Sequence, residues 1–189
     1  AIARGAEDAA LAALAPLLPP AATHLVANTV PVETPRLARL AETGTGVTDL
    51  ATGQALPVQE TAQGSLTLLP PLPAHALRPL ALGAPATVPV DRPVTARLTG
   101  HGAVLENHLL RVAIDPSGRF TSIEDRAAGR EVLVPGRPAN ELQLFEDRPI
   151  SWDAWDIDVF FEDRAEVVDT ATRFELVEDG PLRATLLVE

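Results

Sequence analysis

Turn-forming residues recur so often after residue 19 that the chain can build only short strands between them. Asp115-Pro-Ser-Gly118 and Asp179-Gly-Pro181 are two such turns, and each separates segments rich in apolar residues. Paired segments of this kind fold as β-hairpins. Many short strands between turns are typical of antiparallel all-β proteins. The sequence therefore predicts a mainly β fold, in the form of an antiparallel β-sandwich.

The predicted strands fall in both halves of the chain. In the first half, residues 47–58 are predicted to form a hairpin that turns at 51–53, and residues 24–28 and 65–69 are predicted to form single strands. The Pro-rich stretch 70–93 is predicted to be an edge strand plus an irregular connection, because proline cannot donate to a ladder. In the second half, strands are predicted within 104–114 and at 120–124, 131–134, 141–146, 174–178 and 182–188. Polar and apolar residues alternate at 141–146, which indicates a half-buried strand.

Residues 1–18 follow a different pattern. The segment is rich in alanine, a strong helix former, and its apolar residues recur at steps of three and four until Pro19-Pro20. We predict one short N-terminal helix that closes a helical bundle, because an isolated helix of this length is marginal. The predicted organisation is the end of a helical-bundle domain at 1–20, a small β subdomain at 21–100 and the first part of a β-sandwich domain at 101–189, with the break near residues 99–102.

The charge and the cysteine content exclude several classes of function. The formal net charge is −11, so neither nucleic acid nor an anionic membrane surface is an expected partner. The longest apolar stretch, residues 9–18, is too short to span a bilayer. The chain has no cysteine, which excludes disulfides and zinc–thiolate sites and is compatible with the cytoplasm. Because the sequence starts without Met inside a helical pattern and ends on a strand pattern, we expect a fragment of a longer protein.

Both tryptophans of the chain, Trp152 and Trp155, lie in one short acidic block at residues 140–158. Indole faces stack on the apolar faces of sugars, and carboxylates accept hydrogen bonds from hydroxyls, so the block suits carbohydrate binding. In the alternative interpretation, both indoles fill the core, and the carboxylates face solvent or pair with Arg148 and Arg164. Composition alone favours this alternative.

No residue of the chain is predicted to be catalytic or to bind a metal. On a strand, Asp156 and Asp158 would share one face, as an acid and nucleophile of glycoside hydrolysis could, but acidic pairs on strands are usually solvated. The acidic block lacks the spacing of a calcium loop. The histidines also lack zinc-ligand spacing; they are His24, His75, His101 and His108.

Several segments resemble the β domain of glycoside hydrolase family 38 α-mannosidases. They are Leu105-Glu-Asn-His-Leu-Leu-Arg-Val112, Asp115-Pro-Ser-Gly-Arg-Phe-Thr-Ser-Ile-Glu-Asp125 and Ala128-Gly-Arg-Glu-Val-Leu133. The block that runs from Asn140-Glu-Leu-Gln-Leu-Phe-Glu-Asp-Arg-Pro149 to Trp152-Asp-Ala-Trp-Asp-Ile-Asp158 is similar to a hallmark of the bacterial and cytosolic branch. The resemblance covers essentially the whole chain and is closest at 104–184.

This resemblance implies a Zn²⁺-dependent retaining enzyme that hydrolyses terminal α-mannosides. Its zinc ligands and nucleophile lie in an N-terminal α/β catalytic domain, and no position of this chain matches their motifs. The chain is therefore expected to be a non-catalytic β-domain fragment, inactive and zinc-free by itself, that supports and partly borders the active site. The implied partners are the catalytic domain of the same chain and mannose-containing oligosaccharides, and a homo-oligomer is compatible with the sequence.

The resemblance also suggests which residues contact substrate. By position, Gln143 corresponds to a substrate-contacting strand residue that is usually tyrosine in the family. The other candidates for the pocket rim or the interdomain contact are Trp152, Asp153, Trp155 and Asp156. Two further hypotheses compete with this one. A stand-alone carbohydrate-binding β-sandwich predicts exposed tryptophans, and a purely structural module predicts buried ones. Tryptophan exposure therefore distinguishes the purely structural module from the mannosidase fragment and the carbohydrate-binding module.

Overall fold

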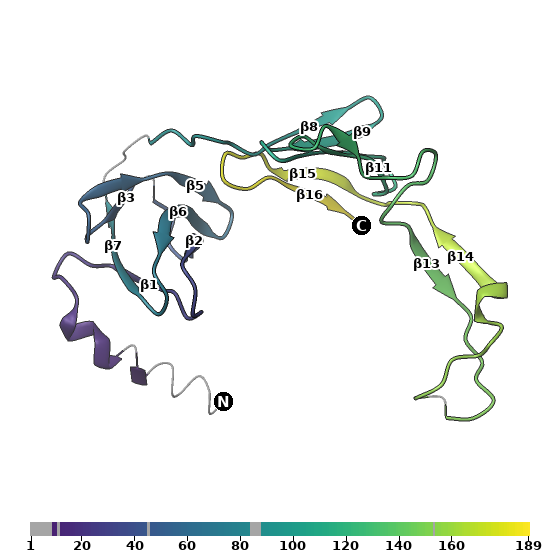
Figure 1. Ribbon diagram of the computed structural model, residues 1–189, viewed down its shortest axis with the longest axis horizontal. Coiled ribbons are helices and arrows are strands. Elements are labelled where there is room, and N and C mark those ends of the chain that lie inside the picture. The colour runs from purple at the N-terminus through teal and green to yellow at the C-terminus, as the bar shows by residue number, and fades with distance from the viewer. Residues whose placement is uncertain (1–8, 11, 45, 84–87, 153) are drawn as a thin grey trace. The chain divides into compact units, whose positions relative to one another are not determined.

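Antiparallel strands make up most of the structure, a computed structural model that describes residues 9–10, 12–44, 46–83, 88–152 and 154–189 (Figure 1). Every strand pairing among the described residues is antiparallel. The predicted mainly β fold with a short N-terminal helix is confirmed. The chain forms two compact units that divide between Asp91 and Arg92.

Two small sheets build the first unit. The four-stranded sheet has the order β1 (His24–Ala27), β7 (Leu77–Gly83), β3 (Gly46–Asp49) and β4 (Gln54–Leu56). The three-stranded sheet has the order β2 (Thr34–Leu40), β6 (Gly64–Leu72) and β5 (Val58–Thr61). Buried leucine and valine side chains from both sheets form one apolar core; its buried members are Leu40, Val47, Leu56, Leu69 and Leu80. The sequence predicted the β3–β4 hairpin, and Gly53 in its turn has a φ of 73°.

Asn28 ties the end of β1 to the rest of this unit. It is buried, and its side-chain Nδ2 donates to the carbonyl oxygens of Val32 (2.8 Å), Leu72 (2.9 Å) and Pro73 (2.9 Å). Leu72 and Pro73 are 44 and 45 residues away from Asn28 in the sequence, whereas Val32 is 4 residues away. One amide group therefore satisfies backbone acceptors that would otherwise be buried without partners.

The prediction of an edge strand plus an irregular connection at residues 70–93 is wrong for 70–72 and 77–83, which belong to interior strands. It is correct for the irregular residues 88–93, and residues 84–87 lie outside the described residues. Pro70 and Pro71 extend β6, and β7 lies in the interior of the four-stranded sheet between β1 and β3. Pro79 is tolerated within β7 because the ladder with β3 ends at the pair Asp49–Leu80, at the residue that follows Pro79. At Pro70 and Pro71, the register of the β2–β6 pair shifts opposite Pro35. The prolines thus sit where the ladders end or bulge.

The N-terminal helix is short. Residues 9–10 and 12–14 are helical and lead into the 3₁₀ helix η1 (Ala15–Leu17), and the extended backbone of Leu18 ends it before Pro19 and Pro20. Residues 1–8 and 11 of the predicted helix lie outside the described residues.

A five-stranded sheet forms the body of the second unit. Its order is β12 (Arg130–Glu131), β11 (Phe120–Asp125), β10 (Leu110–Ile114), β9 (Gly102–Glu106) and β8 (Thr95–Thr99). The segment 104–114 contains most of β9 and all of β10, rather than one strand. Residues 99–102, where the sequence suggested a domain break, form the turn between β8 and β9, within the second unit. The predicted strand at 131–134 is limited to Glu131, which pairs in β12.

A separate hairpin lies against this sheet. It consists of β15 (Phe174–Glu178) and β16 (Thr185–Val188), as the sequence predicted. Two hydrogen bonds join its turn to β8 and to Val94, the residue just before β8. The Val94 N–H donates to the Pro181 carbonyl (2.8 Å), and the Ala96 N–H donates to Asp179 Oδ1 (2.9 Å).

Candidate functional site

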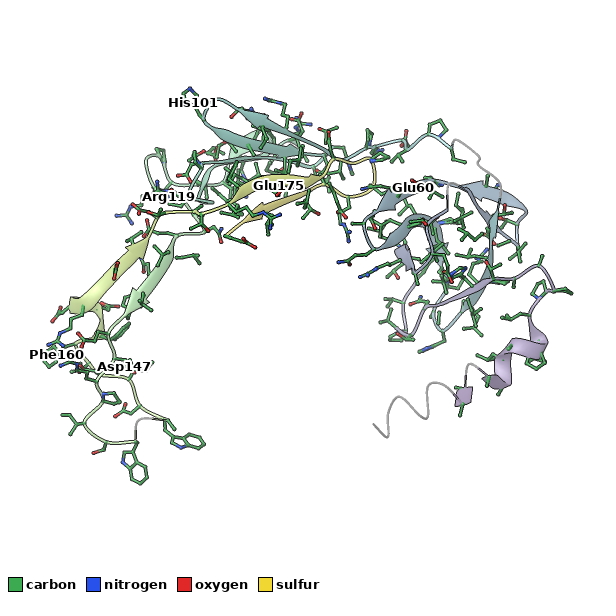
Figure 2. All side chains as sticks on the ribbon, turned by 180° about the vertical axis from the view of Figure 1, so that it is seen from behind. Glu60, His101, Arg119, Asp147, Phe160 and Glu175 are labelled. Carbon is green, nitrogen blue, oxygen red and sulfur yellow. The ribbon has the colours of Figure 1, made fainter. Side chains whose placement is uncertain are left out.

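A two-stranded ribbon with a long loop extends from the second unit; it holds most of the sequence-predicted site residues. β13 (Leu142–Phe145) pairs with β14 (Ala165–Val168), and residues 146–164 connect them. We call residues 142–168 the arm. Figure 1 shows the two strands running away from the five-stranded sheet, and Figure 2 shows Asp147 and Phe160 in the connecting loop.

The ribbon is more exposed than the sequence predicted. Leu142 and Leu144 are each 62% exposed on one face, although their alternation with polar residues indicated a half-buried strand. Val167, on the opposite face, is exposed as well. Within the described residues no second layer covers the ribbon. A lone two-stranded ribbon is marginal in water, so its apolar faces suit contact with another surface.

Polar and aromatic contacts hold the base of the loop closed. The rings of Phe145 and Phe161 meet edge to face, with 5.2 Å between their centroids. Glu146 pairs with Arg148 and, at 2.9 Å, with Arg164. The hydrogen bond from Arg164, helped by the charge of Arg148, lowers the pKa of Glu146 below its ordinary value. Both arginines of the loop are therefore engaged at its base.

The tip of the loop places both tryptophans in one turn. The N–H groups of Trp155 and Asp156 donate to the carbonyl oxygen of Trp152 at 2.6 and 2.9 Å. Trp152 is 76% exposed and Trp155 is 90% exposed. The interpretation that both indoles fill the core is therefore wrong, because the turn projects from a ribbon that has no core around it.

The other predicted site residues are divided between the ribbon and the loop. Asp156 belongs to the tryptophan turn, and its Oδ1 accepts a hydrogen bond from the Ile157 N–H at 3.0 Å. Gln143 lies in β13, where its Nε2 donates to Glu141 Oε1 at 2.7 Å. Asp153 lies outside the described residues. The structure thus brings together Trp152, Trp155 and Asp156, and keeps Gln143 in the ribbon.

The paired-strand geometry considered for Asp156 and Asp158 does not exist. Both residues lie in the irregular loop rather than on a strand. The Asp158 N–H donates to Asp147 Oδ1 at 2.8 Å, and Asp158 Oδ1 accepts from the Phe160 N–H at 3.1 Å. These carboxylates organise the loop backbone. Turn geometry overrides the alternation on which the strand interpretation depended.

An apolar groove in the second unit was not predicted from the sequence. It has a volume of about 520 Å³ and lies between β16 and the neighbouring sheet. Its lining includes Leu105, Ile114, Phe120, Leu186 and Val188. The apolar residues of β16 could have indicated this groove. However, the sequence does not show which face of β16 is left uncovered.

The described residues contain neither a metal-binding cluster nor a membrane-spanning helix. No group of three or more His, Asp or Glu side chains gathers in a way that could hold a metal ion. In that same part of the chain, no helix is both long and apolar enough to cross a bilayer.

Comparison with known proteins identifies the second unit. Residues 105–189 match the family described as the glycosyl hydrolases family 38 C-terminal domain. The chain is 34% identical over 122 residues to alpha-mannosidase 2C1 of Homo sapiens, which covers 64% of this chain and 11% of the human protein. It is 35% identical over 133 residues to the Mus musculus protein of the same name, with 64% and 13% covered.

A third relative is more distant. Alpha-mannosidase G of Dictyostelium discoideum is 31% identical over 86 residues, which is 45% of this chain and 8% of that protein. The chain thus spans only about a tenth of the length of these relatives. The resemblance inferred from the segments at 105–133 and 140–158 is confirmed. Residues 105–189 are thus similar to the C-terminal domain of glycosyl hydrolase family 38.

Proposed function

We propose that the chain is a non-catalytic β region of a retaining α-mannosidase, which hydrolyses terminal α-mannosides, and that it supports and partly borders the active site. Its relatives are named alpha-mannosidases, and the matched family is a C-terminal domain. The chain corresponds to a small share of their length, so the reaction is assigned to the rest of such an enzyme. The expected partners are the catalytic domain of the same polypeptide and a mannose-containing oligosaccharide, in the cytoplasm.

The observation that carries the proposal is the exposed tryptophan turn at the end of an arm. Indole faces stack on the apolar faces of pyranose rings, and a neighbouring carboxylate accepts hydrogen bonds from sugar hydroxyls. Trp152, Trp155 and Asp156 supply both chemistries within one turn. The uncovered ribbon behind the turn suits contact with a catalytic domain. Gln143, in that ribbon, would lie closer to the interdomain contact.

Zinc belongs to the catalytic domain in this proposal. A zinc site needs three or four nitrogen, sulfur or oxygen ligands close together. The chain has no cysteine, and the described residues hold no cluster of three His, Asp or Glu side chains. The described residues therefore offer no zinc site, and in this proposal they bind and position rather than hold the metal.

A stand-alone carbohydrate-binding module is the second candidate. It is favoured by the same observation, because Trp152 and Trp155 are exposed without any other domain present. The purely structural module required both indoles to be buried, which the structure contradicts. The two remaining candidates differ in whether sugar binding depends on a catalytic domain.

Tryptophan fluorescence of this chain tests the proposal, because both indoles lie in the arm and no tyrosine is present. The chain is titrated with mannose and α-mannobiose, and with galactose as a control sugar. We expect a saturable emission shift with the mannosides, weaker iodide quenching in their presence, and loss of the shift in Trp155→Ala. Unchanged emission and unchanged quenching would remove the sugar contact from the proposal.

The supporting role needs a second measurement. In a polypeptide that joins this chain to its catalytic domain, Trp155→Ala should lower kcat/KM for an aryl α-mannoside. The matched control is Leu98→Ala, an exposed residue of β8 outside the arm. If the Trp155→Ala and Leu98→Ala enzymes have the same kcat/KM, the arm does not border the active site.

A further inference from the structure

The tip of the arm carries negative charge without a counter-ion of its own. Residues 149–163 include five acidic residues and no lysine, arginine or histidine. The flanking arginines, Arg148 and Arg164, are both paired with Glu146 at the base of the loop. A surface that pairs with this tip therefore has to bring positive charge, since burying unpaired carboxylates is costly.

The two tryptophans at the tip also favour a positively charged partner. The face of an indole is the negative end of its quadrupole, and tryptophan is the strongest aromatic partner for a cation. Trp152 and Trp155 are largely exposed and follow one another around a single turn. Trp152 has a φ of 62°, which is unfavourable for a bulky residue, and the N–H groups of Trp155 and Asp156 hold it there. The turn thus maintains a strained backbone that displays both rings.

Asp156 adds a carboxylate to the two rings. Its Oδ1 accepts the Ile157 N–H, and Oδ2 has no hydrogen bond within the described residues. A guanidinium group can stack on an aromatic face and donate to a carboxylate at the same time, because it is planar and carries several N–H donors. An ammonium group lacks this combination of shape and donors.

We propose that the turn formed by Trp152, Trp155 and Asp156 binds a guanidinium group, presented as an arginine side chain on the protein surface that the arm contacts. The proposal deepens the proposed function and rests on it, because that surface would then be the catalytic domain bordered by the arm. A second copy of this chain is disfavoured as the occupant, since the net charge of −11 and the acidic tips repel one another. Anionic partners are disfavoured for the same reason.

The test is a fluorescence titration of the whole chain with two short peptides of identical sequence. One contains arginine, and the other contains citrulline, which has nearly the same shape without the charge. We expect a saturable emission change with the arginine peptide, a weaker change with its lysine counterpart, and none with the citrulline peptide. Added salt should weaken the arginine response.

Variants assign the response to the turn. Trp155→Ala should bind the arginine peptide about fivefold more weakly, read from the remaining indole, as expected for loss of one cation–π contact. Asp156→Asn should reduce both the affinity and its dependence on salt. Ile150→Ala, at a fully exposed apolar residue of the same loop, is the matched control and should bind like the unchanged chain.

The outcomes separate this inference from the proposed function. Equal responses to the arginine and citrulline peptides, or unchanged binding in Asp156→Asn, would overturn guanidinium recognition. A response to α-mannobiose without one to the arginine peptide would overturn the inference and leave the sugar contact in place. A response to the arginine peptide alone would support the inference and remove the sugar contact.

Discussion

Arg78 and Asp49 form an ion pair in which the carboxylate is fully enclosed. The Nη1 atom of Arg78 lies 2.9 Å from Asp49 Oδ2, and the Asp49 side chain is 0% exposed. Asp49 Oδ1 also accepts the Ala51 N–H at 2.9 Å. One carboxylate therefore connects β7 to the end of β3 and to the turn that follows it.

Removing this carboxylate should destabilise the first unit strongly. Asp49→Ala leaves the Arg78 guanidinium without its partner and the Ala51 N–H without an acceptor. We expect the free energy of unfolding to fall by about 3 kcal/mol, measured by chemical denaturation. Glu60→Gln, at an exposed position of β5, is the control and should change it by less than about 0.5 kcal/mol. Equal values for the two variants would show that the pair contributes little.

Asn28 should be equally intolerant of change. Asn28→Ala removes the amide that satisfies three carbonyl oxygens, so we expect a loss of about 3 kcal/mol in the free energy of unfolding. Asn28→Asp should be at least as harmful, because a carboxylate would face those oxygens. Gln63→Ala, an exposed turn residue, serves as the control. An Asn28→Asp variant as stable as the unchanged chain would contradict the assigned donor role.

The stability of the second unit should depend on pH through Glu131. The Ser122 hydroxyl, with the N–H groups of Leu133 and Ile123, lowers the pKa of Glu131 from 4.5 to about 2. Because the folded-state pKa is depressed, the stabilisation is fully present above about pH 4.5 and is lost as the pH falls toward about 2. Thermal unfolding of the unchanged chain and of Glu131→Gln should therefore converge at the acid end. A difference in midpoint that is the same at all pH values would refute this.

Gly102 should be irreplaceable at the start of β9. It has a φ of 129°, and an added Cβ would lie 1.9 Å from the backbone oxygen of Ile114. We expect Gly102→Ala to cost about 3 kcal/mol, measured by denaturation. Gly129→Ala is the matched control, because Gly129 also has a positive φ, of 61°, with open space around it. That change should cost only about 1 kcal/mol. Similar losses would mean that backbone conformation, and not the contact with Ile114, sets the requirement.

Local turn chemistry explains which parts of the fold the sequence could predict. The β3–β4 and β15–β16 hairpins join strands that are neighbours in the sequence, and their turns contain Gly53 and Gly180, both with positive φ. The interior position of β7 was missed because it depends on pairing with β1 and β3, both distant in the sequence. Ladder ends, which decide whether a proline is tolerated, are likewise set by the partner strands.

The sequence predicted which residues make up the candidate site, but it did not predict how exposed they are. The residues 140–158 drew attention through Trp152, Trp155 and their acidic neighbours, and three of the candidates do share one turn. Their exposure could not be inferred, because a tryptophan has the same sequence pattern in a core and on an arm. β14 (Ala165–Val168) was not anticipated either, since its partner β13 lies about twenty residues earlier.

The prolines of β6 have a consequence for self-association. The Leu68 N–H donates to the Pro57 carbonyl at 3.3 Å, and the β5–β6 ladder does not extend past Thr67. Two residues further along the same side of β6, Pro70 offers no N–H. An open strand edge can recruit another chain and start aggregation, and an imide at that position blocks the ladder from growing. The residues that complicate strand assignment therefore also keep another strand from pairing along this part of β6.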